Sequence, residues 1–367
     1  LGMPLADVRV LLSSRRRTTA DTAERRVAFW TNQMCERGTE VAVFDYADFA
    51  ERLLGVTAFV LYPFPPSYSA MLHRFARRFG QRCIGMDFTG ALEFCEAARI
   101  GHLYILKEGG PHCPTLPSRI PLTATAVHAI FDARQPSGDA YGRISPTVPD
   151  NARQVPVVPH IVRPRDATGG DMRRELRIPN GATVFGRYGG ADTFSIDFAH
   201  AAVEEVARAC PETIYFLFMN TLPFCDALPN VVHLEATSDD EAKSRFIRTC
   251  DAMLHARYSG ETFGLAVAEF SAHNRPVLAS NVHDDDGAAR MHIITLGTRG
   301  IFYHDRQSLV SKLRSFDRES ASKKDWNAYR DFEPSRVMAD FERIFLKTPE
   351  RLRGASEAAV EAAPANV

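Results

Sequence analysis

The sequence has almost no net charge, no long apolar run and no paired-cysteine motif. Its 367 residues carry 44 Lys and Arg against 45 Asp and Glu, so any basic surface is local and we expect no nucleic-acid partner. No stretch approaches the roughly 20 apolar residues of a membrane span, and the N-terminus lacks a signal-peptide pattern. The seven cysteines contain no CxxC pair, which is typical of reduced, buried thiols. Together these absences predict a cytoplasmic protein.

Metal-binding patterns are also missing. The 12 histidines form no HExxH or HxxxH pair, so the sequence supports no structural metal. We also expect no cofactor. Residues 284–286 (DDD) resemble a DxD metal motif only as a string, and we interpret them as a turn. His112, Cys113 and His160 fall in expected loops and receive no role.

Apolar strand-like runs alternate with helical segments along both halves of the chain, which predicts two α/β, doubly wound, Rossmann-like domains. The expected strands are residues 8–14, 39–46, 57–64, 82–88, 182–189, 213–220, 231–236, 252–256 and 276–280, and the expected helices are 23–37, 69–80, 88–98, 195–209, 239–249, 265–272 and 334–345. A proline-rich stretch over 136–164 fits a linker. We therefore expect domains at 1–155 and 156–330, a C-terminal helical segment at 331–349 and a flexible tail at 350–367.

The segment SGETFGLAVAEF, residues 259–270, is the most informative motif. It follows the expected strand 252–256, so Gly260 to Gly264 should form a strand-to-helix loop. Glycines let such a loop turn tightly, and the free amides at a helix N-terminus attract an anion such as phosphate. Glu261 lies in the loop, and Glu269 lies about one turn inside the helix. Two carboxylates flanking an anion suit a sugar, a diphosphate and a ribose; the alternative is an ordinary crossover with two solvated glutamates.

The order of PVVPHIVRP, ATVFGRYGG, TIYFLFMN, SGETFGLAVAEF and RPVLASN resembles the C-terminal half of retaining GT-B glycosyltransferases of family 4 (glycosyltransferase group 1). The resemblance covers about residues 155 to 345. It implies two Rossmann-like domains facing across a cleft, with the helix at 334–345 crossing back to the N-terminal domain. It further implies that Glu261 contacts the donor sugar, that Glu269 contacts the ribose, and that the loop from Gly260 binds sugar or diphosphate through Thr262, Phe263, Gly264 and Leu265.

The same resemblance assigns roles near two other strand ends. Gly186 and Arg187 occupy the place of a phosphate-binding arginine, and Ala236 and Thr237 fall where family members contact the base. The family's following lysine is missing, because residues 192–194 read Asp-Thr-Phe. Thr193 or Ser195, or another basic residue, would have to replace it. For Arg187 the alternative is a surface ion pair.

The N-terminal half matches the family by architecture alone. Residues 15–17 (RRR) could supply the missing cation or form a solvated loop. Asp87 stands where many family members carry a histidine facing the sugar, which would make it a hydroxyl ligand or base. An N-cap of the following helix explains Asp87 equally well.

Residues 71–82 (MLHRFARRFGQR) combine apolar residues at helical spacing with arginines. Such a helix could rest on an anionic membrane, which would make the protein peripheral to it. A crossover helix that buries its phenylalanines against a sheet explains the same pattern, and we favour it.

The resemblance implies a metal-independent retaining enzyme that moves a hexose-type sugar from a UDP- or GDP-type donor to a hydroxyl of a glycan or lipid-linked acceptor. Glu261, Arg187 and Asp87 are the candidate catalytic residues. The alternatives are a GT-B enzyme that is not a transferase, such as a nucleotide-sugar epimerase or phosphorylase, and a nucleotide-sugar-binding protein that has lost catalysis.

Overall fold

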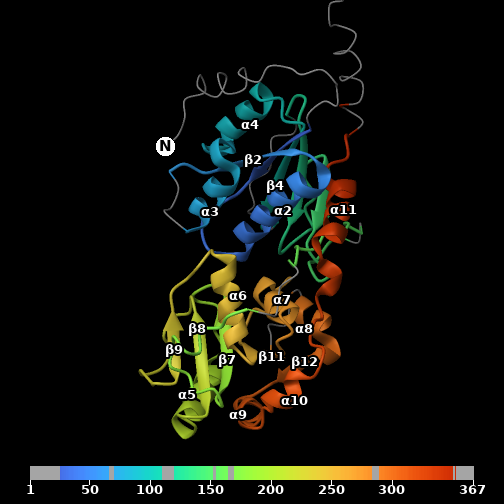
Figure 1. Cartoon of the computed structure of the whole chain (residues 1–367). Coiled ribbons are helices and arrows are strands. Elements are labelled where there is room, and N and C mark those ends of the chain that lie inside the picture. Colours follow the sequence, from blue (N-terminus) through green and yellow to red (C-terminus); the bar gives the residue numbers. More distant parts are fainter. Residues whose placement is uncertain are drawn as a thin grey trace, which may run out of the picture. The chain divides into compact units, whose positions relative to one another are not determined.

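The computed structural model describes residues 25–65, 70–109, 120–151, 154–163, 169–282, 289–349 and Leu352. These residues form two compact units (Figure 1). The N-terminal unit takes the described parts of Leu1–Cys35, Thr39–Pro159 and Ser335–Val367, and the C-terminal unit takes Glu36–Gly38 and His160–Pro334. No helix in these ranges is both long enough and apolar enough to cross a membrane.

The N-terminal unit contains a parallel sheet in the order β3-β2-β1-β4-β5-β6. Starting from the central strand β1, the chain builds outward in one direction and then in the other, which is the doubly wound arrangement. Its elements are β1 (Arg26–Trp30), α2 (Gly38–Leu54), β2 (Thr57–Tyr62), α3 (Ala70–Phe79), η1 (Gly80–Arg82), β3 (Cys83–Gly85), α4 (Phe88–Ala97), β4 (His102–Lys107), β5 (Ala124–Ala129), β6 (Ala140–Arg143) and α11 (Pro334–Phe345).

Two segments of this unit have the opposite structure from the prediction. Residues 39–46, expected as a strand, lie in helix α2, and residues 23–37, expected as a helix, contain strand β1. The middle of helix α2 is buried on all sides, including Asp45 and Asp48, so the helix lacks the exposed polar stripe of an amphipathic helix, and its apolar residues 41–44 resemble a strand. Such a run is compatible with either a strand or a buried helix. The strand expected at 8–14 lies outside the described residues.

Helix α11 completes the N-terminal unit from the far end of the chain, as predicted. Phe341 stacks on Tyr46 with ring centroids 5.0 Å apart, and Phe345 packs edge-on against Tyr104 at 5.5 Å. Gly142 of β6 permits this approach, because a Cβ there would lie 2.7 Å from the Phe345 ring. Each fully buried phenylalanine contributes about 2–3 kcal/mol of hydrophobic stabilisation.

The C-terminal unit repeats the doubly wound topology with β7 as its first strand. All strand pairs in the order β12-β11-β10-β7-β8-β9 are parallel. Its elements are β7 (Thr183–Tyr188), α5 (Asp197–Ala209), β8 (Ile214–Met219), β9 (Val231–Leu234), α6 (Asp240–Thr249), β10 (Ala252–His255), α7 (Leu265–Ala272), β11 (Val277–Ser280), α8 (Met291–Leu296), η2 (Gly297–Arg299), β12 (Gly300–Tyr303), α9 (Arg306–Arg314), α10 (Arg318–Ser322) and η3 (Arg330–Phe332). Because strand order reverses at β7, the topological switch point lies between β7 and β10, where open α/β sheets bind ligands.

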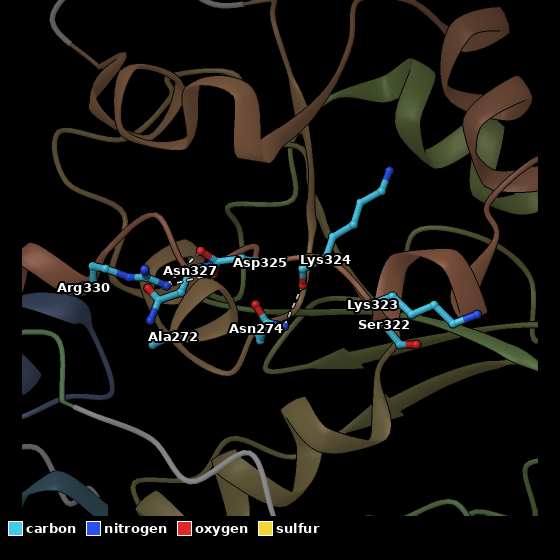
Figure 2. A pocket seen from close by; sticks show the side chains of 8 residues that line it. All are labelled: Ala272, Asn274, Ser322, Lys323, Lys324, Asp325, Asn327 and Arg330. Atoms are coloured by element: carbon cyan, nitrogen blue, oxygen red, sulfur yellow. Dashed lines mark hydrogen bonds and ion pairs between the residues drawn. The ribbon is translucent and has the colours of Figure 1, made fainter.

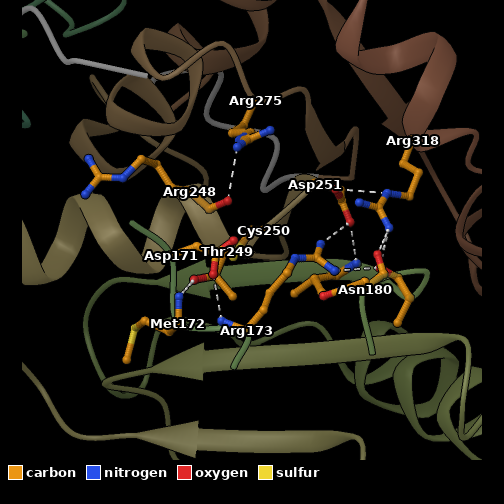
Figure 3. Close-up of polar contacts among 12 residues, drawn as sticks. Asp171, Met172, Arg173, Asn180, Arg248, Thr249, Cys250, Asp251, Arg275 and Arg318 are labelled. Atoms are coloured by element: carbon orange, nitrogen blue, oxygen red, sulfur yellow. Dashed lines mark hydrogen bonds and ion pairs between the residues drawn. The ribbon is translucent and has the colours of Figure 1, made fainter. Parts of the chain in front are cut away.

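A polar network joins the amino ends of β7 and β10 (Figure 3). Asp251 accepts hydrogen bonds from the Val184 amide and from Arg173 Nη2, both at 2.8 Å, and Arg318 Nε lies 3.4 Å from its other oxygen. Arg173 is 9% exposed, so the carboxylate of Asp251 provides the counter-charge that stabilises its buried guanidinium. The network therefore links the segment before β7 to the strand beside it.

We expect Asp251→Ala to lower the free energy of unfolding by about 3 kcal/mol, because it leaves the buried Arg173 guanidinium without its counter-charge. Glu319→Ala is the matched control, since its pair with Lys323 lies on the surface and should contribute at most about 1 kcal/mol. Urea denaturation of both variants measures the difference. Equal urea midpoints for the two variants would show that Asp251 does not stabilise the fold in this way.

Candidate functional site

The loop between β10 and α7 has the geometry that its glycines predicted. Gly260 and Gly264 have φ of 63° and 84°, values that favour glycine. A Cβ on Gly260 would lie 2.1 Å from the Ala289 carbonyl oxygen, which accepts a hydrogen bond from the Glu261 amide at 2.7 Å. Gly264 is the N-cap of α7, and no side chain of the described residues caps that helix. The first-turn amides of α7 therefore lack the usual side-chain acceptor.

The Glu261 carboxylate lies between two basic side chains. Arg257 Nη1 is 2.9 Å from Oε2, and His255 Nε2 is 3.3 Å from Oε1. Burial alone would raise the pKa of Glu261, but the hydrogen bond from His255 and the positive charge of Arg257 outweigh burial and lower it to about 2. The side chain is 20% exposed. The carboxylate is thus ionised and only partly open to solvent, so the interpretation as a solvated glutamate is wrong.

Arg187 projects from the carboxyl end of β7, the neighbour of β10. It is 4% exposed, so the alternative of a surface ion pair is wrong. Its Nη2 donates to the Gly190 carbonyl at 2.9 Å and its Nη1 to the Asn220 carbonyl at 3.3 Å. Two further hydrogen bonds reach the hydroxyls of Thr193 and Thr221. These four uncharged oxygens hold the guanidinium in one orientation.

No carboxylate of the described residues forms an ion pair with Arg187. Burial lowers the pKa of Arg187 to about 10; the negative charge of Glu261 opposes this shift, and the positive charge of Arg257 adds to it. At neutral pH the guanidinium remains charged. Arg187, Glu261 and Arg257 therefore lie close enough to influence one another electrostatically, at the switch point between β7 and β10.

Glu269 lies inside α7 and is 7% exposed, so it is not solvated either. Its Oε1 is 3.4 Å from Nζ of Lys243, a buried residue of α6. Helix α6 precedes β10 in the chain and α7 follows it, and this ion pair joins the two helices. Lys243 was missed by sequence reasoning, because nothing in α6 marks that residue as facing α7.

The remaining predicted donor-binding residues have structural roles that the site requires. Phe263 is buried, with its ring 5.3 Å from His160, 5.8 Å from Tyr329 and 5.2 Å from Phe332, and this cluster fixes the loop. Thr262 is also buried. Gly186 admits Cys250, whose sulfur would lie 2.1 Å from a Cβ there.

Residues at the other strand ends contribute in different ways. Thr193 accepts from Arg187 and donates to the Gly190 carbonyl at 2.9 Å, so it orients the arginine. Ala236 and Thr237 follow β9, an edge strand of the sheet, with Thr237 Oγ1 accepting from the Asp239 amide at 3.1 Å. The Ser195 hydroxyl accepts from the Tyr258 amide at 3.1 Å.

Asp87 is the N-cap of α4, with its carboxylate accepting from the Gly90 amide at 2.7 Å. The N-cap interpretation is therefore confirmed. Asp87 follows β3, an edge strand, two strands away from the switch point between β1 and β4. Residues 15–17, residues 284–286, His112 and Cys113 lie outside the described parts of the chain, and within those parts no three His, Cys, Asp or Glu side chains are grouped to hold a metal.

Helix α3 buries its phenylalanines in the N-terminal unit. Phe75 and Phe79 pack against Phe44 of α2, with ring centroids 5.2 and 5.8 Å apart. Arg78 pairs with Asp48 of α2 at 2.6 Å. The crossover-helix interpretation is confirmed for these side chains, and contact with a membrane stays a prediction.

A surface hollow of about 460 Å³ lies at the C-terminal end of α7 (Figure 2). It contains none of the predicted site residues. Its charged lining is largely paired, because Arg330 binds Asp325 at 2.8 Å and Lys323 binds Glu319 at 2.9 Å. We assign it no ligand.

No protein-family model matches the sequence, and no curated protein matches it. Solved structures match over nearly the whole chain. The UDP-glucose complex of HepE (Alr3699) from Anabaena is 12% identical with a TM-score of 0.60, covering 92% of this chain and 99% of that one. A glycosyltransferase from Rickettsia africae is 11% identical with a TM-score of 0.57, covering 94% and 100%. MurG from Acinetobacter baumannii is 10% identical with a TM-score of 0.53, covering 88% and 100%.

Identities this low show the fold alone. The two doubly wound parallel sheets, the helix that returns to the first unit and the likeness along the full length of these structures agree with one another. The protein therefore has the GT-B fold of glycosyltransferases, built from two Rossmann-like units.

Proposed function

We propose that the protein is a retaining glycosyltransferase, which moves a hexose-type sugar from a nucleoside diphosphate sugar to a hydroxyl of a glycan or lipid-linked acceptor without a metal. The observation that carries the proposal is Arg187, a buried cation with no carboxylate partner among the described residues. A buried charge without a counter-charge is costly to stability. A ligand diphosphate would supply the missing negative charge.

The surroundings of Arg187 favour a phosphate over other anions. The guanidinium lies at the switch point of the sheet, and α7, which follows the neighbouring strand β10, begins without a side-chain cap. Helix N-termini and arginine guanidiniums both bind phosphate groups. HepE, which has the same fold, was solved with UDP-glucose and with UDP. UDP-glucose is therefore the first donor to test.

The proposed reaction breaks the bond between the anomeric carbon and the donor phosphate and forms a bond from that carbon to the acceptor oxygen. Arg187 and the amides of Thr262 to Leu265 would stabilise the negative charge that develops on the leaving diphosphate. The acceptor proton would pass to a phosphate oxygen of the departing diphosphate, on the same face of the sugar, which retains the anomeric configuration.

Glu261 cannot act as a general acid at neutral pH, because its pKa lies at about 2. As an ionised carboxylate it would accept hydrogen bonds from donor-sugar hydroxyls and stabilise positive charge on the anomeric carbon. Glu269, held by Lys243, would accept from the ribose hydroxyls. The backbone at Ala236 and Thr237 would face the base. We assign Asp87 no chemical step, because its carboxylate caps α4.

Titration calorimetry and thermal unfolding of the full chain with UDP, GDP, ADP, TDP and CMP test the proposal, each with and without EDTA. We expect one nucleoside diphosphate to bind and to raise the melting temperature by several degrees when present at about 100 times its Kd. EDTA should leave this shift unchanged. Absence of binding by every nucleotide would overturn the proposal.

Products separate the alternatives. Incubation with the bound donor and a hydroxyl acceptor should yield a glycoside whose anomeric configuration, read by NMR, matches that of the donor. An epimerised sugar from the donor alone would indicate an epimerase, and a sugar phosphate formed from glycan and inorganic phosphate would indicate a phosphorylase. If the protein binds the donor but neither transfers the sugar nor slowly hydrolyses the donor, it has lost catalysis.

A further inference from the structure

Arg257 lies two residues after β10, and its side chain contacts Glu261. No motif in the sequence assigns it a role. Its Nη1 bonds to Glu261 Oε2 at 2.9 Å, and its Nε bonds to the Ser259 hydroxyl at 3.1 Å. Its Nη2 has no hydrogen-bond partner among the described residues. The side chain is 29% exposed, in contrast to Arg187, which is buried and held by four oxygens. One arginine of the site is therefore fixed by four oxygens, and the other is held by one carboxylate and one hydroxyl.

Two positive guanidiniums lie in this cluster. Both interact with the ionised carboxylate of Glu261, toward which His255 also turns a ring nitrogen. Asp192 also interacts electrostatically with Arg187 but forms no ion pair with it. The positive charge of Arg257 makes Arg187 easier to deprotonate, which is the sign of mutual repulsion between the two. An anion with two or more negative charges would relieve that repulsion by binding both.

We propose that Arg257 is a second ligand of the donor diphosphate, and that its movement from Glu261 to the diphosphate frees Oε2 to accept a donor-sugar hydroxyl. This inference rests on the proposed function. Arg257 is the more exposed partner of this pair, at 29% against 20% for Glu261, so its guanidinium can turn toward a ligand in solvent. A diphosphate offers more charge and allows a two-pronged hydrogen bond to the guanidinium. His255 continues to hold Oε1, so the carboxylate stays in place while its other oxygen opens.

Movement of Arg257 from Glu261 to the diphosphate would couple binding of the donor diphosphate to binding of the donor sugar. In the unliganded protein Glu261 is engaged by Arg257 and presents no open Oε2 to a sugar. Diphosphate binding would then be required before the sugar is recognised. A free sugar should accordingly bind poorly, and the nucleoside diphosphate should bind well without its sugar.

The test uses Arg257→Ala and Arg257→Lys in the full chain, with Arg208→Ala as the control. Arg208 forms an i,i+4 ion pair with Glu204 at 2.7 Å on α5, the same spacing as Arg257 and Glu261. Calorimetry measures the affinity for UDP and for uridine, or for the corresponding pair if another base is preferred. We expect Arg257→Ala to weaken UDP binding about tenfold or more and uridine binding less than twofold, since one charge-assisted contact is lost. Arg257→Lys should be intermediate, and the control should match the wild type.

A double-mutant cycle tests the exchange itself. Glu261→Gln should tighten UDP binding several-fold, because Arg257 no longer has to leave a carboxylate. In the Arg257→Ala background the same substitution should give no such gain. An equal gain in both backgrounds would mean simple repulsion between Glu261 and the diphosphate, and would overturn the exchange.

Binding by the wild type distinguishes failure of the role proposed for Arg257 from failure of the proposed function. If the wild type binds no nucleoside diphosphate, the proposed function itself fails. If the wild type binds UDP and folded Arg257→Ala binds it equally well, the proposed function stands and the role of Arg257 is wrong.

Discussion

Arg187→Ala should remove most of the affinity for the nucleoside diphosphate. Loss of a buried, hydrogen-bonded charge that faces an opposite charge typically costs at least about 2 kcal/mol, which corresponds to about 30-fold in Kd. Arg187→Lys should retain only part of the wild-type affinity for the nucleoside diphosphate. A lysine is a point charge and cannot keep hydrogen bonds to both Thr193 and Thr221 while also facing a phosphate. Calorimetric titration with UDP measures both variants.

Arg299→Ala is the matched control for this prediction. Arg299 belongs to the same unit, but its side chain is exposed and lies 3.4 Å from Asp325. It should leave UDP affinity and unfolding unchanged. If Arg187→Ala retains wild-type affinity while remaining folded, the buried guanidinium does not bind phosphate, and the anion site must be assigned elsewhere.

Glu261→Gln should mainly reduce turnover, whereas Glu269→Gln should mainly reduce affinity for the nucleoside diphosphate. Glu261→Gln should reduce kcat about 100-fold, because an ionised carboxylate beside the anomeric carbon stabilises positive charge in the transition state and a neutral amide does not. It should not weaken binding of the nucleoside diphosphate. Glu269→Gln should weaken that binding about tenfold, through the ribose, and change kcat less. Steady-state kinetics and titration of each variant separate the two effects.

Both glutamates are largely buried, so each variant needs a check of folding by thermal unfolding. Glu204→Gln, on the exposed face of α5, is a suitable control for removal of a carboxylate charge. Small and equal effects of Glu261→Gln and Glu269→Gln on affinity and turnover would contradict the site. The fold would stand in that case, because it does not depend on these side chains.

In the C-terminal unit the sequence predicted strands β7 to β11 and helices α5, α6 and α7, and it predicted none of β12, α8, α9 and α10. The predicted strands are short apolar runs that end in glycine, proline or polar residues, and α6 begins at a recognisable cap, Asp239. The two glutamates were found because their spacing places one in a glycine-rich loop and the other inside the helix that follows. Arg187 was found through the family resemblance, which implies a phosphate-binding arginine at the end of that strand.

The N-terminal unit was less predictable, for a physical reason. Helix α2 is covered on nearly every side, so burial removed the polar stripe that marks most helices. Strand β1 is short and flanked by charged residues, which resembles a helical pattern in sequence. Local propensity could not separate these states, and contacts with the rest of the unit decided them.

Some site residues had no signal in the sequence. Lys243 contacts Glu269 from another helix, and Arg257 and His255 meet Glu261 only because the loop after β10 folds back on itself. The register that pairs Ala252 with Phe185 brings β10 beside β7 and places Glu261 near Arg187. The close packing of α6 and α7 joins Lys243 to Glu269. For Asp87 the sequence allowed both a cap and a catalytic role, and the structure shows the cap.

The sequence by itself determined that this is a doubly wound α/β protein with a glycine-containing strand-to-helix loop and two glutamates, Glu261 and Glu269, in and after that loop, because strand length, glycine position and residue spacing are local properties. Only the tertiary structure decided that Arg187 is buried without a carboxylate partner among the described residues, and that Arg257 shares Glu261 with His255. Burial and charge pairing depend on which strands become neighbours, and that is set by the packing of the whole unit.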